Sequence, residues 1–173
     1  MSGPTYRIVR LAPEHDLGAF DCSEEYYNSW LAHHAREADT RGTSAVYLLV
    51  CLNGDGTDPK VCGYFAICPT MVQSAVVPNQ IKRSIMRQAP GWLLAKLALD
   101  RSLRGGTWGR ELLREAIEEI VRAADSGGGQ VIVVDAENEQ VCTWYRGQGF
   151  LGTGIENLRL YMKVSTAREY LNP

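Results

Sequence analysis

A glycine-rich turn that opens a long amphipathic helix constrains the fold of this chain more than any other feature. The turn is RGGTWG, residues 104–109. The apolar residues after it recur with the period of an α-helix and form one stripe: Leu112, Leu113, Ala116, Ile117, Ile120, Val121 and Ala124. A short apolar run precedes the turn at 92–99, and another follows the helix at 130–134. This order predicts buried strands on both sides of a helix, which is typical of α/β and α+β proteins.

The rest of the chain predicts further elements around this unit. Strands are expected at 6–11, 43–52, 61–68 and 158–164, and helices at 21–38 and 138–147. Asp21 or Ser23 is the expected N-cap of the first helix, which should end at Arg41 and Gly42. Residues 53–59, NGDGTDP, predict a hairpin loop. The intervening segment 69–90 is expected to hold a short strand near 72–77 and a short helix near 80–87. Because a hairpin joins antiparallel strands, the sheet should be mixed.

Length and composition indicate one globular domain spanning residues 1–173. The chain has 45% apolar and 22% charged residues, which is ordinary for a folded protein. No apolar run approaches the roughly 18 residues of a membrane helix, and the N-terminus lacks the apolar segment of a signal peptide. A cytoplasmic protein without membrane contact is therefore expected. The five cysteines are odd in number and form no CxxC pair, which predicts reduced thiols and no metal site.

Positive charge is concentrated in one part of the sequence. The net charge is −2, but the segment from Lys82 to Arg114 carries eight basic and two acidic residues. That segment is +6, which leaves −8 for the rest of the chain. Such an asymmetry indicates an anionic ligand at a defined place. A solvated charged face is the alternative, and charge by itself does not exclude it.

The glycine-rich turn itself has the features of a phosphate-binding site. A turn that opens a helix presents unpaired backbone N–H groups at the positive end of the helix dipole. Arg101, Arg104 and Arg110 bracket the turn and add positive charge. The sequence is neither a P-loop, since no GK[ST] follows, nor a Rossmann motif, since the glycine spacing differs. A tight turn that needs glycine only for its backbone remains the alternative.

Two motifs in this order resemble those of the GCN5-related N-acetyltransferases, the GNAT superfamily. In the acetyl-CoA motif Q/R-x-x-G-x-G/A, Arg104 matches the first position and Gly109 the last, while Thr107 replaces the middle glycine. Residues 136–150 resemble the second motif, N-x-x-A-x-x-x-Y-x-x-x-G-F. Four of its residues match, and Val141 replaces the alanine: Asn138, Tyr145, Gly149 and Phe150. The resemblance covers residues 6–163.

The resemblance implies a GNAT fold of class α/β (α+β), with a central mixed V-shaped sheet of six to seven strands and about four helices. The sheet would open between its fourth and fifth strands, where the pantetheine of acetyl-CoA would lie. The implied acetyl-CoA-binding residues are Leu97 and Leu99 on the preceding strand, then Arg104, Gly105, Gly106, Thr107, Trp108, Gly109 and Arg110 at the turn, and Asn138. Tyr145 would protonate the leaving thiolate as general acid, and a backbone N–H of strand 92–99 would stabilise the oxyanion. The resemblance identifies no general base and implies no metal.

The N-terminal part resembles the GNAT-type toxins of bacterial toxin–antitoxin systems. Their pattern is F-x-C-G followed by L-x-x-W-L and a G-x-S/T turn. Ser23 replaces the glycine, and Tyr27 or Asn28 falls near the usual leucine. The following residues fit the pattern: Phe20, Asp21, Cys22, Trp30, Leu31, Ala35, Gly42 and Ser44. Residues 61–67 resemble another of their strands. These toxins acetylate the amino group of aminoacyl-tRNA, usually form dimers, and pair with an antitoxin that is often a DNA-binding protein. The resemblance therefore implies a homodimer with such a partner. Lys82, Arg83 and Arg87 are the expected tRNA-binding residues.

Three functions remain open at this point. The first is a toxin that acetylates aminoacyl-tRNA, against which the acidic isoelectric point of 5.9 counts, because RNA binding favours a broad basic face. The second is acetylation of a small-molecule amine or of a protein or peptide amine. The third is a relative that binds acetyl-CoA or a partner without catalysis. His33 and His34 are expected to be surface or semi-buried residues rather than ligands or bases.

Overall fold

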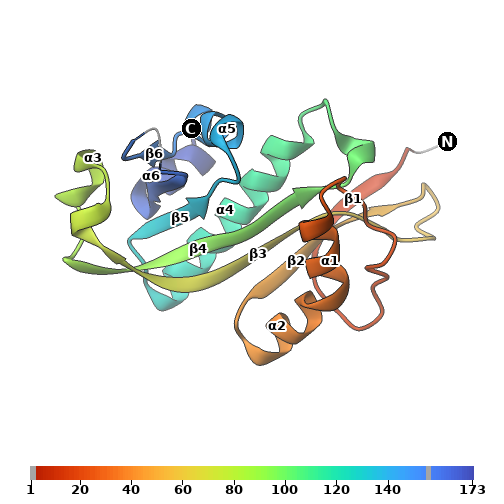
Figure 1. The fold of residues 1–173 in the computed structure, drawn as a ribbon. Coiled ribbons are helices and arrows are strands. Elements are labelled where there is room, and N and C mark those ends of the chain that lie inside the picture. The colour runs from red at the N-terminus through yellow and green to blue at the C-terminus, as the bar shows by residue number, and fades with distance from the viewer. Residues whose placement is uncertain (1–2, 155–156) are drawn as a thin grey trace. The chain divides into compact units, whose positions relative to one another are not determined.

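The computed structural model describes residues 3–154 and 157–173, and over these residues it contains seven strands and six α-helices (Figure 1). The strands are β1 (Thr5–Arg10), β2 (Ala45–Leu52), β3 (Lys60–Gln73), β4 (Gln88–Leu99), β5 (Val131–Asp135), β6 (Leu151–Gly152) and β7 (Arg159–Lys163). The helices are α1 (Glu25–His33), α2 (Ala35–Arg41), α3 (Asn79–Lys82), α4 (Trp108–Gly127), α5 (Glu139–Gly147) and α6 (Val164–Leu171). Hydrogen bonds link the strands in the order β1-β2-β3-β4-β5-β7-β6. The sheet is mixed, as predicted, because β4 and β5 are parallel while the other described pairs are antiparallel.

The chain forms two compact units. The first comprises Met1–Ile67 and Lys96–Ala116, and the second comprises Cys68–Ala95 and Ile117–Pro173. Three elements, β3, β4 and α4, contribute residues to both units. The single domain over residues 1–173 stays a prediction.

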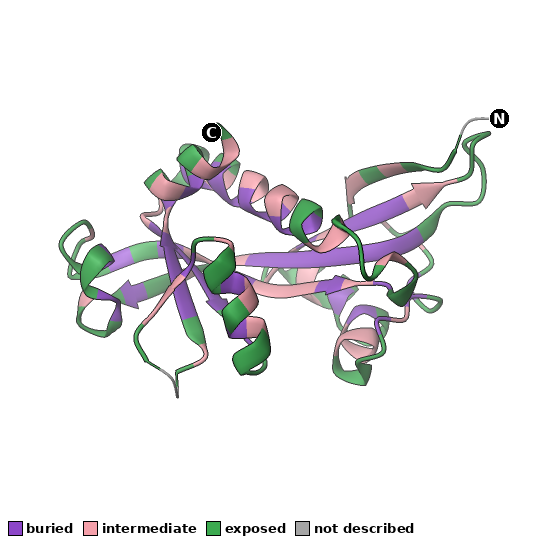
Figure 2. Ribbon diagram, turned by 90° about the horizontal axis from the view of Figure 1, so that it is seen from above, coloured by how far each residue is buried: buried purple, intermediate pink, exposed green. Residues whose placement is uncertain are grey.

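In the first unit, an antiparallel sheet is covered by helices on both faces. Adjacent residues of a strand point to opposite faces, and β3 illustrates this at Gly63 and Tyr64. The Tyr64 hydroxyl donates to the carbonyl of Tyr27 at 2.8 Å, and its ring stacks on Trp30, so this face carries α1. A Cβ at Gly63 would lie 3.3 Å from Leu112 Cδ2, so α4 packs closely on the other face. Figure 2 shows buried residues concentrated along the strands and exposed residues in the connecting loops.

In the second unit, β5 lies between β4 and β7. It pairs in parallel with β4 over Gly91–Leu94 and antiparallel with β7. A Cβ at Gly91 would lie 2.6 Å from the carbonyl oxygen of Val131, so only glycine allows this approach of the two strands. The core includes Val72, Ile81 and Val133. The V-shaped opening between the fourth and fifth strands stays a prediction.

The single helix expected at 21–38 is wrong, because the structure has two helices that meet at His34. The backbone of His34 leaves helical geometry at φ −124°. The second helix is held by its own contacts: Arg36 donates to the carbonyl of Ala12 at 2.9 Å, and Asp39 accepts from the N–H of Val46 at 2.9 Å. Asp21 does not cap the helix, because the N-cap is Glu24. Gly42 ends the second helix in the left-handed conformation, as predicted.

The segment between residues 69 and 90 also differs from the prediction. Strand β3 continues to Gln73, and a 3₁₀ turn, Ser74–Val76, stands where a strand was expected near 72–77. The helix expected near 80–87 is α3, which is only four residues long. The number of helices is six rather than about four, partly because α6 follows β7. Two small buried residues hold α6 in place, together with an ion pair of Arg168 with Asp125 at 2.5 Å. Two buried residues are too weak a periodic signal for the helix to be predicted from the sequence.

Candidate functional site

The turn between β4 and α4 in the first unit has the geometry of an anion-binding site. Gly105 has φ +82°, a left-handed conformation that favours glycine. A Cβ at Gly106 would meet no atom within 4 Å, so space lies open beside the backbone. The carbonyl of Thr107 accepts from the N–H of Glu111 at 3.1 Å and thereby begins the helix. The N–H groups of the first helical turn have no acceptor within the helix, which makes the start of a helix suited to binding an anion.

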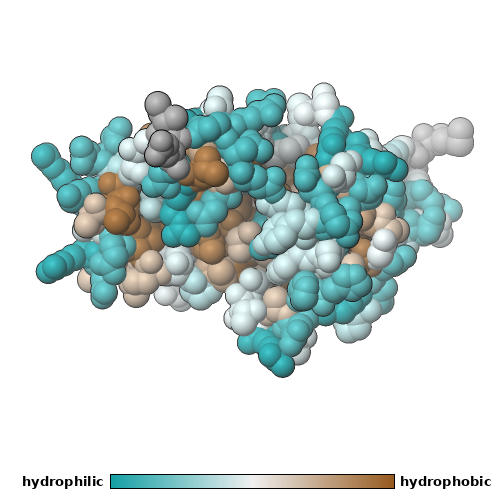
Figure 3. Space-filling model, in the orientation of Figure 1, coloured by the Kyte–Doolittle hydropathy of each residue, from teal (hydrophilic) through white to brown (hydrophobic). Residues whose placement is uncertain are grey.

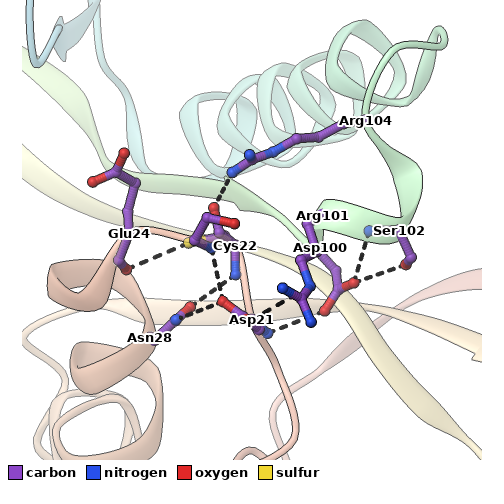
Figure 4. A network of polar contacts seen from close by, with 9 residues as sticks. Asp21, Cys22, Glu24, Asn28, Asp100, Arg101, Ser102 and Arg104 are labelled. Carbon is purple, nitrogen blue, oxygen red and sulfur yellow. Dashed lines mark hydrogen bonds and ion pairs between the residues drawn. The ribbon is translucent and has the colours of Figure 1, made fainter.

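The arginines around the turn differ in what they contact. Arg104 donates to the carbonyl of Cys22, and the Arg101 guanidinium lies 3.5 Å from the Asp21 carboxylate (Figure 4). Both side chains therefore hold the loop before α1. Arg110, on the first turn of α4, is exposed. Contact of Arg110 with an anionic ligand stays a prediction.

Asp100 is a polar residue of this region that the sequence analysis did not identify. It follows β4 directly and is only 3% exposed. Its carboxylate accepts from the N–H of Asp21 at 3.1 Å and from both the N–H and the hydroxyl of Ser102, at 3.0 and 2.7 Å. Burial opposes the charge, but these hydrogen bonds outweigh it and hold the pKa of Asp100 below its ordinary value. The Asp-x-Ser spacing just before a glycine-rich turn was an available signal, since Asp often bonds the backbone two residues on.

The backbone conformation of the loop before α1 explains why the toxin motif has glycine at the position that Ser23 occupies here. Ser23 has φ +66°, so it occupies the left-handed region that glycine adopts at least cost. Asp21 stabilises this conformation, because its carboxylate accepts from the N–H of Ser23 at 2.8 Å and from the amide of Asn28 at 3.0 Å. These two contacts, together with a smaller effect of Arg101, lower the pKa of Asp21. The loop therefore keeps the geometry of the motif without its glycine.

Leu97 and Leu99 lie on the last residues of β4, in the same unit as the turn. Both are half-buried, and within the predicted buried strand 92–99 only Leu94 and Ala98 are fully buried. The ammonium group of Lys96, between them in sequence, lies over the rings of Tyr26 and Trp30 at 5.4 and 5.0 Å.

Tyr145 lies in the second unit, on α5. Its side chain is 7% exposed, and its ring makes edge contacts with Trp144 and Phe150. Burial, with a smaller effect from the charge of Glu137, raises the pKa of Tyr145 well above its ordinary value. The phenol is therefore protonated at neutral pH, which is the state that a general acid requires.

Asn138 has a structural role at the start of the same helix. It is the N-cap of α5, and its side-chain oxygen accepts from the N–H of Val141 at 2.9 Å. An N-cap of this kind accounts for asparagine without any ligand. Contact of Asn138 with acetyl-CoA stays a prediction.

Lys82, Arg83 and Arg87 are exposed in the second unit. Lys82 and Arg83 line an open cavity of about 790 Å³, together with Ser74, Asn79 and Gln80. Exposed apolar side chains lie on the same unit, and Figure 3 shows apolar surface beside α3: Met71, Val76 and Met86. The basic segment of the sequence is thus divided, because its other five basic residues belong to the first unit.

Within residues 3–154 and 157–173, no three His, Cys, Asp or Glu side chains are grouped so as to hold a metal ion. The helices of this part of the chain include none that is long and apolar enough to cross a membrane. Both His33 and His34 are exposed, as predicted.

The chain is similar over most of its length to proteins named as toxins. No family model matches it. It is 29% identical over 159 residues to the "tRNA-acetylating toxin" of Mycobacterium tuberculosis (strain H37Rv), and the aligned residues make up 92% of each chain. It is 24% identical to the "Probable toxin TacT" of Sinorhizobium fredii (strain NGR234), which covers 98% of both.

Solved structures agree with this similarity. A tyrosine-to-phenylalanine mutant of KacT has a TM-score of 0.85 at 25% identity, covering 95% of this chain and 98% of that one. AtaT in complex with acetyl-methionyl-tRNAfMet has a TM-score of 0.84 at 26% identity, with the same coverage. This chain is similar to GNAT-type toxins in sequence and in fold. AtaT has also been solved with acetyl-CoA and the antitoxin AtaR, and the AtaT–AtaR complex with DNA.

The predicted sites of this chain fall into two groups. The first unit brings together Leu97, Leu99 and the turn from Arg104 to Arg110, which forms a continuous segment around the start of α4. The second unit contains Asn138 and Tyr145 on α5 and the three basic residues at and after α3. The GNAT fold class predicted from the two motifs is confirmed by the mixed sheet and by the solved GNAT toxins.

Proposed function

We propose that this chain is an acetyl-CoA-dependent N-acetyltransferase that acetylates the α-amine of aminoacyl-tRNA and acts as a toxin. One observation carries the proposal: the chain is similar along nearly its whole length to a tRNA-acetylating toxin and to AtaT, which was solved with an acetylated aminoacyl-tRNA. The glycine-rich turn would bind the acetyl donor, and the buried tyrosine would protonate the leaving thiolate.

The donor site is formed by the turn in the first unit. The backbone N–H groups of residues 104–109 would bind the pyrophosphate of acetyl-CoA, and Arg110 would add charge. The left-handed Gly105 and the open space beside Gly106 fit a ligand that approaches the backbone. Thr107 adds a side chain where the motif has glycine, and its hydroxyl can donate to a phosphate oxygen. The backbone of Leu97 and Leu99 would bind the pantetheine.

The transfer needs a neutral amine, a stabilised oxyanion and a protonated leaving thiolate. Tyr145 would supply the proton, since its raised pKa keeps the phenol protonated. A backbone N–H of β4 would stabilise the oxyanion. The α-amine of an aminoacyl ester is more acidic than the amine of lysine, so a large share of it is neutral near pH 7. This acceptor therefore reacts without a strong general base.

The acceptor RNA would meet the exposed cations of the second unit. Lys82, Arg83 and Arg87 are exposed, and the first two line an open cavity, which suits contact with phosphates. A local basic site of this size also reconciles RNA binding with the acidic isoelectric point of 5.9. Contacts would be limited to the part of the tRNA near the aminoacyl end.

The same proposal includes the setting of the enzyme. We infer a cytoplasmic homodimer, because aminoacyl-tRNA is a cytoplasmic substrate and toxins of this type form dimers. Its partner would be a DNA-binding antitoxin, as AtaR is for AtaT. A short basic protein encoded beside this chain would be the candidate.

The variant Gly109→Asp tests the donor site. It adds a side chain and a negative charge among the N–H groups of the first helical turn, where the charge would repel the pyrophosphate. Calorimetry is expected to show that acetyl-CoA affinity falls by at least tenfold. Asp125→Asn, at the far end of α4, is the control and should bind as the wild type does. Unchanged affinity in Gly109→Asp would remove the turn from the donor site.

The acceptor is tested with labelled acetyl-CoA against charged tRNA, polyamines and peptides in parallel. Label is expected on charged tRNA, and expression without the antitoxin is expected to arrest growth. Label on a polyamine or peptide, with harmless expression, would favour the small-amine or peptide acetyltransferase instead. Binding of acetyl-CoA without transfer to any acceptor would indicate a non-catalytic relative.

A further inference from the structure

We propose that Asp100 is a positioning residue for the pyrophosphate of acetyl-CoA, acting through the backbone of the turn rather than by contact with the ligand. The inference rests on the proposed function, since it assigns the turn to acetyl-CoA. The groups involved are called the Asp100 network (Figure 4): Asp21, Cys22, Asp100, Arg101, Ser102 and Arg104.

Hydrogen bonds of both the backbone and the side chain hold Asp100 in place. Its N–H donates to the carbonyl of Cys62 at 2.8 Å, which ties it to β3. One carboxylate oxygen accepts both hydrogen bonds from Ser102, and the other accepts the N–H of Asp21. Both oxygens are therefore used, and the residue is nearly inaccessible to solvent. A group so placed controls the direction in which the chain leaves β4.

Hydrogen bonds continue from Asp100 to the first residue of the turn. The carbonyl of Asp100 accepts from Leu103 N–H at 3.0 Å, and that of Arg101 accepts from Arg104 N–H at 3.3 Å. The loop before α1 holds the same segment from outside, because Arg101 N–H donates to the carbonyl of Asp21 at 3.0 Å and the Arg104 side chain donates to that of Cys22. Every step from β4 to Arg104 is thus anchored.

The residues beyond Arg104 have no comparable restraint of their own. Gly105 and Gly106 are the most flexible residue type, and their surroundings are open. Their N–H groups converge on a phosphate only if the chain enters the turn in the right direction. Without the anchor, binding would have to order the turn as well, and that ordering costs affinity. The Asp100 network therefore preorganises the turn.

Most residues of the network lie outside the apolar core cluster of their unit. Of its members only Cys22 belongs to the core cluster, and Ser102 and Arg104 are exposed. Loss of the Asp100 charge is therefore expected to act on phosphate binding more than on the fold. A ligand that lacks the pyrophosphate separates the two effects.

Asp100→Asn is the test variant. It keeps one oxygen for Ser102 but turns an amide N–H₂ toward the N–H of Asp21, so that two donors face each other. Calorimetry should show a Kd for acetyl-CoA raised about tenfold. The Kd of S-acetylpantetheine, which has no pyrophosphate, should stay within about twofold when measured by competition. Ser102→Ala removes one contact and should give an intermediate increase for acetyl-CoA alone.

Asp55→Asn is a matched control. Asp55 repeats the pattern in the exposed hairpin loop, where its carboxylate accepts from the N–H and hydroxyl of Thr57 at 2.9 and 2.6 Å. This variant removes the same charge and keeps one oxygen for Thr57, far from the turn in sequence, and it should change neither Kd.

The outcomes are distinguishable from those of the proposed function. If Asp100→Asn weakens both ligands equally, or weakens neither, the positioning role is overturned. If the wild-type protein binds no acetyl-CoA, the proposed function itself fails. Binding that Gly109→Asp weakens but Asp100→Asn does not would sink this inference alone. Should Asp100→Asn fail to fold, Ser102→Ala decides, since Ser102 is exposed.

Discussion

Replacing Tyr145 by phenylalanine is expected to lower kcat for acetyl transfer by about 10²–10⁴-fold, the usual effect of losing a proton-transfer group. The variant removes the hydroxyl but keeps the ring and its edge contacts with Trp144 and Phe150. The fold and the turn in the first unit should be unaffected, so the Kd of acetyl-CoA should stay within about twofold. Single-turnover rates with charged tRNA, together with calorimetry, measure the two quantities.

Tyr161→Phe is the control for this loss. Tyr161 is also a buried tyrosine of the second unit, on β7, and burial raises its pKa too. Removing its hydroxyl should leave kcat within about twofold. A fall of less than about threefold in Tyr145→Phe would exclude Tyr145 as the general acid. Relief of growth arrest by Tyr145→Phe, but not by Tyr161→Phe, would give the same answer in cells.

The pH dependence follows from the direction of the Tyr145 shift. A tyrosine whose pKa is raised keeps its proton across the neutral and mildly alkaline range. The rate of transfer is therefore expected to rise with pH as the acceptor amine loses its proton, and then to level off. No alkaline decrease from Tyr145 should appear below about pH 10, the ordinary pKa of tyrosine. A decrease between about pH 7 and 9 would point to a different acid.

Reversing three charges at and after α3 should lower acetyl transfer to tRNA to an extent comparable with the loss of Tyr145. With Lys82, Arg83 and Arg87 all replaced by glutamate, transfer to charged tRNA is expected to be abolished while acetyl-CoA binds normally. These side chains are exposed, so the substitutions cost little stability. Each lost phosphate contact should also flatten the salt dependence of tRNA binding by about 0.7–0.9 in the logarithmic slope.

A second triple variant controls for total charge. Arg7, Arg41 and Lys60 are exposed in the first unit, outside the basic segment. Replacing them by glutamate changes the net charge by the same amount. This control should retain most of the transfer to charged tRNA. Equal loss in both triple variants would mean that overall charge, rather than this site, governs RNA binding.

The sequence was sufficient to predict elements whose signal is local. The apolar stripe predicted α4, and Gly42 correctly ended α2. The tyrosine of the second motif lies on a short helix, as expected from the pattern around it. In each case the residues that determine the structure lie within a few positions of one another.

Features determined by distant contacts were not predictable in this way. The break at His34 follows from contacts of α2 with the N-terminal loop and β2. The Asp-x-Ser spacing could indicate the local hydrogen bonds of Asp100 with Ser102, but not its contact with Asp21, which lies 79 positions away. Arg104 matched the motif, yet its side chain binds the loop before α1. The motif predicts the residue type at position 104, but not the group that its side chain contacts.

The close approach at Gly91 has a consequence for the order in which the chain folds. Strands β2 and β3 are neighbours in the sequence, and the short hairpin between them brings them together early in folding. The parallel pair of β4 and β5 closes only after the whole of α4 has been spanned, and it closes with no room for a side chain at residue 91. Long-range pairings of this kind form slowly, because the entropy of closing the loop is lost before contacts are gained. During synthesis, the edge of β4 that pairs with β5 therefore stays exposed until β5 has been made. In this interval the nascent chain is most open to aggregation.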